Sequence, residues 1–138
     1  MMECPFCNLD KSISKLIYEY DSWRLFLHAG EKRERLRLAA GFLATKEHEP
    51  NLSKLSKDVW AELQVIYKDA AQRLCNVAEV TYIGQETVGF NQGAESGQTI
   101  NHAHVHIFPM ASEDSAELKQ RGGMSGAFEA LYRERVKT

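Results

Sequence analysis

Three of the five histidines in the chain occupy alternate positions of one short segment, NHAHVHIFP (101–109): His102, His104 and His106. Successive side chains of a β-strand point to opposite faces of the sheet, so this spacing places all three imidazoles on one face. Three neighbouring imidazoles pack poorly as a hydrophobic core. The segment is therefore predicted to be a strand that carries chemistry on one of its faces.

Length and composition predict a single globular domain over residues 1–138. A chain of this length can bury a core of its own, and its 43% hydrophobic and 26% charged residues are ordinary for a soluble protein. The net charge of −2 gives no electrostatic reason to expect non-specific binding to nucleic acid. We therefore expect no nucleic-acid polymer as a partner.

The chain shows no pattern for export or for membrane insertion. No apolar run approaches the length of a membrane-spanning helix, and the start MMECPFC lacks the charged and apolar regions of a signal peptide. Two of the three cysteines are spaced Cys4-x-x-Cys7, which fits a reducing compartment better than a disulfide framework. These features predict a cytoplasmic protein with no membrane partner.

The first part of the chain is predicted to form three strands. KLIYEY (15–20) and WRLFLHA (23–29) are rich in strand-forming residues, and Asp21 and Ser22 between them favour a hairpin. GFLATKEH (41–48) is the third candidate.

An arginine-rich segment, GEKRERLRL (30–38), precedes the third strand. It allows two interpretations. One is a solvated loop or edge strand; the other is a face lined by Arg33, Arg35 and Arg37 beside an anionic ligand.

Residues 56–75 form the clearest predicted helix. Ser56 is placed to cap its N-terminus, and Asp58 lies in the first turn, where an acidic residue favours the helix. Apolar residues recur along it at helical spacing: Val59, Leu63, Ile66, Ala70 and Leu74.

Two further strands are predicted after the helix, at 86–91 and 99–108, joined by a polar loop that contains Gly93 and Gly97. Pro109 is expected to end the second strand. Beyond it, 110–138 is predicted to be a helical extension with a break at Gly122–Gly123. This order of elements indicates an α+β fold with an antiparallel sheet rather than alternating βαβ units.

The row of histidines allows two kinds of chemistry. All three rings could chelate one metal ion, as in a catalytic zinc site. Alternatively, one histidine could be a nucleophile supported by the other two. Chelation leaves GAESGQT (93–99) unexplained, whereas the backbone N–H groups of this loop and its Gln98 and Thr99 side chains could hold an anion. The second interpretation therefore predicts a phosphate-binding loop beside a nucleophile.

The segment GQTINHAHVHIFP (97–109) resembles the histidine triad (HIT) motif, His-φ-His-φ-His-φ-φ preceded by Gly-Gln-Ser/Thr. Asn91 with Gly93 matches the Asn-x-Gly of that family, and GFLATKEH (41–48) is similar to its Gly-His-x-Leu-Val-x-Pro-Lys-x-His segment.

The resemblance covers roughly residues 4–109, because CPFC (4–7) is similar to the Cys-x-x-Cys at the start of many bacterial members. It implies an antiparallel sheet with one long helix. It also implies a protein, usually a homodimer, that acts on small-molecule nucleotides at the α-phosphorus.

The resemblance also assigns catalytic roles. His104 would be the nucleophile, whose neutral ring attacks phosphorus and forms a covalent nucleotidyl-histidine that water then hydrolyses. His106 would contact the phosphate or the leaving-group oxygen. The residues expected to hold phosphate oxygens or to order their loop are Asn91, Gly97, Gln98 and Thr99, and such positioned donors typically contribute about 10² to 10³ in rate each.

Cys4, Cys7, His48 and His102 together supply the ligand number and types of a closed structural zinc site. The set resembles the zinc site of bacterial family members and predicts one structural zinc per chain. The alternative is a metal-free pair of thiols, with His48 as an ordinary loop residue.

The sequence departs from the family pattern at three places. Ala40 or Gly41 stands where a histidine is usual, and Thr45 replaces a proline. His28 stands where the family commonly has an acidic residue that binds the ribose hydroxyls, which makes His28 a candidate substrate-binding residue.

Three functions remain open at this point. The leading one is a nucleotide hydrolase or transferase that acts on nucleoside phosphoramidates or dinucleoside polyphosphates. A catalytically silent nucleotide- or partner-binding protein on the same fold is the second. The third is a metal hydrolase that holds one ion with all three histidines.

Overall fold

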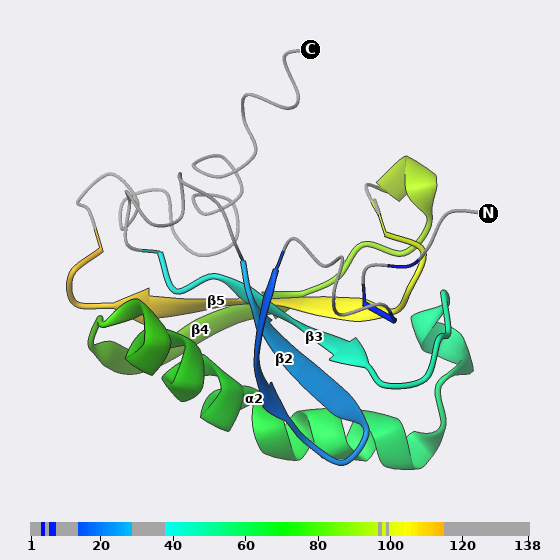
Figure 1. Cartoon of the computed structure of the whole chain (residues 1–138), viewed down its shortest axis with the longest axis horizontal. Coiled ribbons are helices and arrows are strands. Elements are labelled where there is room, and N and C mark those ends of the chain that lie inside the picture. The colour runs from blue at the N-terminus through cyan, green and yellow to red at the C-terminus, as the bar shows by residue number, and fades with distance from the viewer. Residues whose placement is uncertain are drawn as a thin grey trace.

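The computed structural model, shown in Figure 1, describes residues 4, 6–7, 14–28, 38–96, 98 and 100–114. Several predicted features lie outside these residues: the face of Arg33, Arg35 and Arg37, the loop residues Gly97 and Thr99, and the helices expected beyond residue 114.

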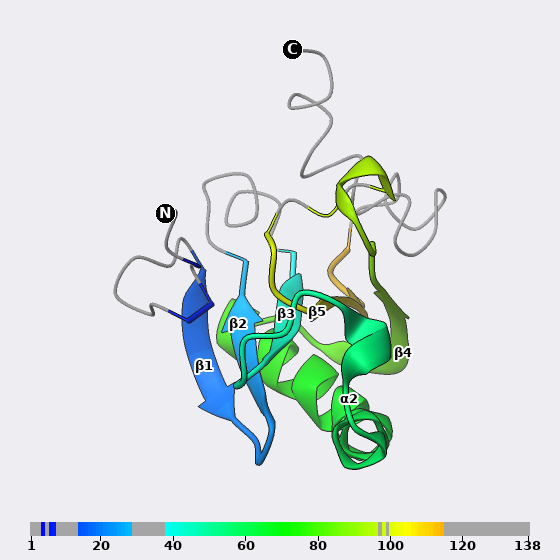
Figure 2. The ribbon, with the colours of Figure 1, turned by 90° about the vertical axis from the view of Figure 1, so that its right-hand side faces the viewer.

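Five strands form one antiparallel sheet in the order β1-β2-β3-β5-β4, which Figure 2 shows from left to right. The strands are β1 (Lys15–Glu19), β2 (Trp23–Leu27), β3 (Gly41–Thr45), β4 (Tyr82–Gly89) and β5 (His104–Ala111). With one long helix beside the sheet, the predicted α+β fold is confirmed. The first three strands follow chain order, but β5 lies inside the sheet between β3 and β4.

The hairpin predicted at Asp21 and Ser22 is confirmed, because β1 and β2 pair on either side of that turn. All three of the first strands end one to three residues earlier than predicted.

The helix α2 (Lys57–Ala78) begins where the sequence predicts and continues three residues further. The Ser56 hydroxyl accepts a hydrogen bond from the Val59 N–H at 3.3 Å, as expected for an N-cap. No glycine or proline follows Cys75 to stop the helix, which ends at Glu79 in a left-handed conformation with φ of 59°.

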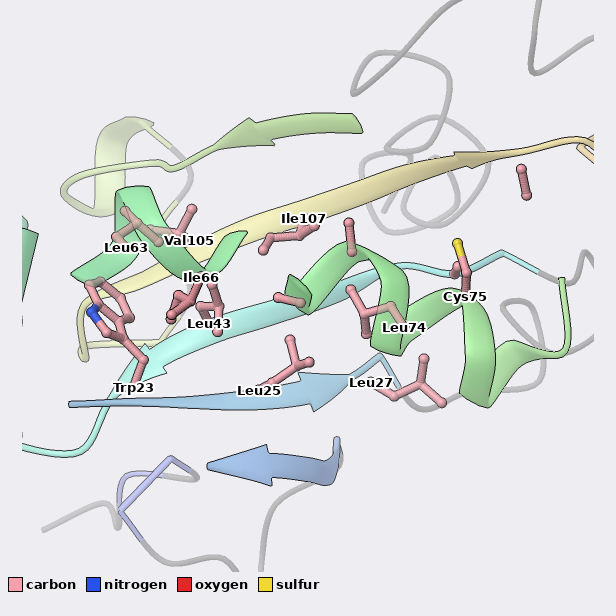
Figure 3. Packing of buried hydrophobic residues seen from close by; sticks show 14 of the residues in the cluster. Trp23, Leu25, Leu27, Leu43, Leu63, Ile66, Leu74, Cys75, Val105 and Ile107 are labelled. Carbon is pink, nitrogen blue, oxygen red and sulfur yellow. The ribbon is translucent and has the colours of Figure 1, made fainter. Parts of the chain in front are cut away.

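One face of the sheet packs against α2 and forms an aliphatic core, shown in Figure 3. Four of the five residues in the predicted stripe are buried there, and Val59 is half-buried. Gly41 permits this close packing, since a Cβ atom on it would lie 2.4 Å from the Phe26 carbonyl oxygen and 2.5 Å from a Leu74 methyl carbon. The glycine therefore sets how closely α2 approaches β3.

The prediction that Pro109 ends the last strand is wrong. The strand begins at His104 rather than at residue 99, and it continues through Pro109 to Ala111, where it pairs with β4. Pairing with β3 stops at Ile107, so from there β5 has a partner strand on one side only. Half of the N–H groups of such a segment need no strand partner, and proline is tolerated there.

The prediction for β4 is also corrected, since this strand spans Tyr82–Gly89 instead of 86–91. Among the described residues, no helix is long and apolar enough to span a membrane.

Candidate active site and metal centre

The alternation of β5 separates the histidines from the core. Val105 and Ile107 join the aliphatic core under α2, whereas His104 and His106 point to the other face of the sheet. We call this the histidine face; it is formed by the side chains of Phe26, His28, Phe42, Ala44, His104, His106 and Phe108. His104 and His106 are 6% and 7% exposed. The structure therefore places these two on one face, as the spacing predicts, whereas His102, which was predicted to lie on the same strand, precedes it.

The hydrogen bond of His104 fixes which ring nitrogen can react. Its Nδ1 lies 2.7 Å from the carbonyl oxygen of His102, and because a carbonyl only accepts, Nδ1 carries the proton. The lone pair then resides on Nε2. Burial lowers the pKa of His104 below its ordinary value, which keeps the ring neutral near pH 7. A neutral imidazole with a defined lone pair is the form that nucleophilic attack requires.

The His106 ring lies 5.3 Å from that of His104, centroid to centroid, and stacks on Phe108 with an interplanar angle of 9°. Burial first, and then the nearby His104 and His28, lower its pKa to about 3. His106 is therefore neutral at working pH, and it can offer an N–H hydrogen bond to an anion but no full positive charge.

The structure brings Cys4, Cys7, His48 and His102 together from segments far apart in the chain. The Cys7 sulfur lies 3.2 Å from His48 Nδ1 and 3.4 Å from His102 Nδ1, and the Cys4 sulfur lies 3.3 Å from His102 Nδ1. All four ligand atoms fall within 4.8 Å of one another, close enough to hold a metal ion.

These distances fit a tetrahedral centre. With zinc–sulfur bonds of about 2.3 Å and zinc–nitrogen bonds of about 2.0–2.1 Å, the edges of the tetrahedron would be about 3.3–3.8 Å. The two Nδ1 atoms of His48 and His102 are 3.2 Å apart, a position in which two lone pairs would repel unless a cation or a proton lay between them. The donor set thus matches a four-ligand metal site with no open position.

Thr45 orients one of these ligands. His102 Nε2 lies 2.6 Å from the Thr45 carbonyl oxygen, so Nε2 carries the proton and donates it there, and Nδ1 is left to face the thiols. The Thr45 hydroxyl is 3.2 Å from the same nitrogen and donates to the Glu47 carbonyl at 2.8 Å. Sequence analysis noted Thr45 only as a departure from the family pattern, and a backbone acceptor gives no signal in a sequence.

Phe6, between the two cysteines, was missed by sequence analysis. Its side chain is 1% exposed, and its ring lies 5.1 Å from the His104 ring and 5.7 Å from the His102 ring. Its apolar character inside a Cys-x-x-Cys segment is the signal that could have revealed it. Phe6 connects the metal centre to the predicted nucleophile by direct packing.

The loop before β5 is ordered by two glutamine side chains. Gln98 accepts from the Gly93 N–H at 2.8 Å and donates to the Ile100 carbonyl at 3.0 Å. Gln92, which sequence analysis did not single out, accepts from the Leu52 N–H at 2.8 Å. Of the two roles expected for Gln98, this geometry favours ordering of the loop.

Two of the other predicted substrate-binding residues, Asn91 and His28, lie among the described residues. Asn91 is half-buried just after β4, and Gly93 adopts a φ of 88°, which favours glycine. His28 is half-buried at the end of β2, and its ring stacks on Phe42 with centroids 5.6 Å apart. The site therefore unites His28, His104 and His106 on one surface.

The hypothesis that all three histidines chelate one ion does not fit this geometry. His102 directs Nδ1 toward the cysteines and Nε2 toward Thr45, while His104 donates Nδ1–H to a backbone carbonyl. The row is thus divided, with His102 in the four-residue cluster that could hold a metal ion and the next two histidines on the histidine face.

The sequence matches the HIT domain over residues 11–113, three quarters of the chain. The chain belongs to the HIT domain family. No similarity to a curated protein sequence was found.

Solved structures of the HIT family share the fold. The hypothetical histidine triad nucleotide-binding protein of Sulfolobus tokodaii superposes with a TM-score of 0.61 at 25% identity, covering 79% of this chain and 70% of that one. A HIT family protein of Bacillus anthracis gives a TM-score of 0.59 at 15% identity, over 99% and 97% of the two chains. A HIT family hydrolase of Clostridium thermocellum gives 0.56 at 20% identity, over 81% and 94%.

Proposed function

We propose that this HIT protein is a nucleotide hydrolase or nucleotidyltransferase that acts at an α-phosphorus through a covalent intermediate on His104. Its substrates are nucleoside phosphoramidates or dinucleoside polyphosphates. The Sulfolobus relative is described as nucleotide-binding and the Clostridium relative as a hydrolase, which supports this class of activity.

The observation that carries the proposal is the tautomer of His104, whose Nδ1–H is committed to the His102 carbonyl at 2.7 Å. In the proposed reaction, the Nε2 lone pair forms a bond to phosphorus and the bond to the leaving group breaks. An amine leaving group takes up a proton from solvent water as it departs, and the water that attacks in the second step loses one. Water then attacks the nucleotidyl-histidine, returns the electron pair to Nε2 and releases the nucleoside monophosphate.

His106 assists as a positioned hydrogen-bond donor and not as a cation. Since its ring is neutral, it donates an N–H hydrogen bond to a phosphate oxygen while His104 attacks from the neighbouring position. Gln98 holds the loop that brings backbone N–H groups toward the phosphate. Asn91, Gly97 and Thr99 are proposed to belong to the same phosphate-binding loop.

We propose that the metal is one structural zinc per chain, held by Cys4, Cys7, His48 and His102. Four protein ligands leave no position for water, so the metal stabilises the fold and takes no direct part in the reaction. Both cysteines must be reduced to bind it, which supports a cytoplasmic location.

The test of the function is turnover of a nucleoside 5′-phosphoramidate, together with an acid quench and intact mass measurement to trap the adduct. Wild type should release the monophosphate and carry a transient nucleotidyl mass, and His104→Asn should show neither. Near-wild-type turnover by His104→Asn would overturn the role of His104. If wild type binds the monophosphate but never turns over the phosphoramidate, the protein is the catalytically silent alternative.

We further propose that the protein is a homodimer joined through the outer edge of β4. This edge strand and the segments beside it expose the apolar residues Val77, Ile83, Val88 and Phe90, which a second copy would cover. Light scattering should report about twice 15.7 kDa. Val88→Lys should give a monomer, and Tyr18→Lys on the opposite edge strand should not; a monomeric wild type at micromolar concentration would refute the proposal.

A further inference from the structure

We propose that His28 binds a second anionic group of the substrate, so that this protein prefers nucleotides that carry a phosphate in addition to the one that reacts. The inference rests on the proposed function and adds the substrate class.

Phe42 lies between His28 and the two reactive-surface histidines. Phe42 is on β3, which pairs with β2 on one side and with β5 on the other. Its ring centroid lies 5.6 Å from that of His28 on the β2 side and 5.1 Å from that of His106 on the β5 side. His28 and His106 therefore lie on two sides of one buried ring, and a ligand that contacts both imidazoles must span Phe42.

The backbone holds His28 in this position. Its N–H donates to the Ala40 carbonyl at 2.9 Å, which extends the β2–β3 pairing by one step beyond Leu27 and Gly41. With the ring stacked on Phe42 at an interplanar angle of 29°, the imidazole is presented by a paired strand end. The His28 ring is thus held at a defined place, where it can bind one group of a ligand.

Among the described residues, the seven that form the histidine face include no acidic side chain. Its members are aromatic, small or imidazole-bearing, and those nearest Phe42 are His28, His104 and His106. A carboxylate in the place of His28 would repel a second phosphate, whereas an imidazole donates an N–H hydrogen bond to it in either protonation state. The surface therefore favours a planar group flanked by two anions.

The same chemistry argues against a pair of ribose hydroxyls as the partner of His28. Two hydroxyl donors require two acceptor positions, which a carboxylate offers and a neutral imidazole does not, since it has one acceptor and one donor nitrogen. The second phosphate could be attached to the ribose or could be the next phosphate of a chain. Both present the same oxygen acceptors, and the experiment below distinguishes them.

The experiment measures binding of AMP, ADP, adenosine 2′,5′-bisphosphate and adenosine 3′,5′-bisphosphate by calorimetry to wild type, His28→Gln and His28→Asp. A charge-assisted hydrogen bond of ordinary strength predicts that wild type binds a doubly phosphorylated ligand about 10- to 100-fold more tightly than AMP. His28→Gln should reduce this ratio, and His28→Asp should reverse it. Lys57→Gln, which removes a cation at the start of α2, is the matched control and should keep the wild-type ratio.

Preference for either bisphosphate would place the second phosphate on the ribose, and preference for ADP would place it on the phosphate chain; each supports the inference. Equal affinity of wild type for all four ligands, or a ratio unchanged in both His28 variants, would overturn it. Circular dichroism and melting curves verify that the variants are folded. Because binding of these ligands requires no turnover, the result does not depend on the His104 test, and either proposal can be refuted without the other.

Discussion

The two faces of the sheet are both buried, but they are built from different chemistry. Within β5, Val105 and Ile107 are 1% and 0% exposed on the side of α2, and His104 and His106, which alternate with them, are almost as buried on the other side. The α2 face is closed mainly by aliphatic side chains, and the indole N–H of Trp23 there donates to the Val59 carbonyl at 2.9 Å. The histidine face is closed by phenylalanines and imidazoles, whose nitrogens require partners.

This difference indicates which face contributes mainly to stability and which to chemistry. Burying aliphatic surface stabilises the fold by about 25 cal/mol per Å², and nothing else is needed from those residues. Burying an imidazole costs free energy unless its nitrogens are hydrogen-bonded, as His102 and His104 are to backbone carbonyls. We infer that the α2 face mainly determines stability and that the histidine face has been shaped for chemistry.

The sharpest way to break this comparison is to substitute neighbours on opposite faces. His104→Asn should lower turnover by a factor of about 10⁴ or more, because it removes the proposed nucleophile, and should change the free energy of unfolding little. Val105→Ala should do the reverse, with a loss of about 1–3 kcal/mol in stability and near-normal turnover per folded molecule. Steady-state kinetics and urea unfolding measure the two effects. Equal losses of activity in both variants would mean that the faces are not functionally distinct.

The metal centre is predicted to give the next largest effect. Cys7→Ser should lose the metal, since one of four ligands is removed, and elemental analysis of protein purified without chelator should fall from one zinc per chain to well below one. With zinc at about 100 times its dissociation constant, the lost stabilisation is about 3 kcal/mol. This corresponds to a melting temperature lower by about 10 °C.

Cys75→Ser is the control for that measurement, because Cys75 lies in the aliphatic core and not among the ligands. It should lower stability without changing the zinc content. Wild type with well under one zinc per chain and freely reactive Cys4 and Cys7 would contradict the metal site.

Gly41→Ala tests how closely α2 packs on the sheet. The added Cβ would lie 2.4 Å from the Phe26 carbonyl oxygen, so the helix or the strand must shift. Overpacking of this kind costs about 1–3 kcal/mol in the free energy of unfolding. Gly84→Ala is a poor control because of its positive φ, whereas Ala61→Gly on the exposed side of α2 should cost only about 1 kcal/mol. Unchanged stability of Gly41→Ala would show that the contact is loose.

The last prediction is a pH dependence carried by the histidine face. The pKa of His106 is lowered by burial from its ordinary 6.5 to about 3, so between these values the unfolded chain binds a proton that the folded chain does not. Stability should therefore fall as pH decreases below about 6.5, by at most about 1.4 kcal/mol per pH unit from this group.

His106→Gln should show a shallower decline in stability between pH 6.5 and pH 5 than wild type does. Both proteins are to be unfolded by urea in the presence of chelator, so that acid release of metal contributes to neither curve. Parallel curves would show that His106 does not titrate on unfolding.

Patterns confined to a few neighbouring residues could be predicted from the sequence. The Ser56 cap and the apolar stripe identified α2, and the alternation of histidines identified the strand and its two faces. Prediction failed where the structure of a segment depends on which strands pair with it. Pro109 could not be recognised as part of β5, because its tolerance depends on β3 ending its pairing at Ile107.

The sequence by itself determined which residues can form strand or helix, and which donor types could bind a metal or attack phosphorus, because these follow from side-chain chemistry and local spacing. Only the tertiary structure placed β5 between β3 and β4, and this arrangement brings His102 to Cys4, 98 positions away in the chain. The same arrangement packs Phe6 against His104 and sets Phe42 between His28 and His106. Such contacts depend on how all elements share one core, and no local pattern encodes them.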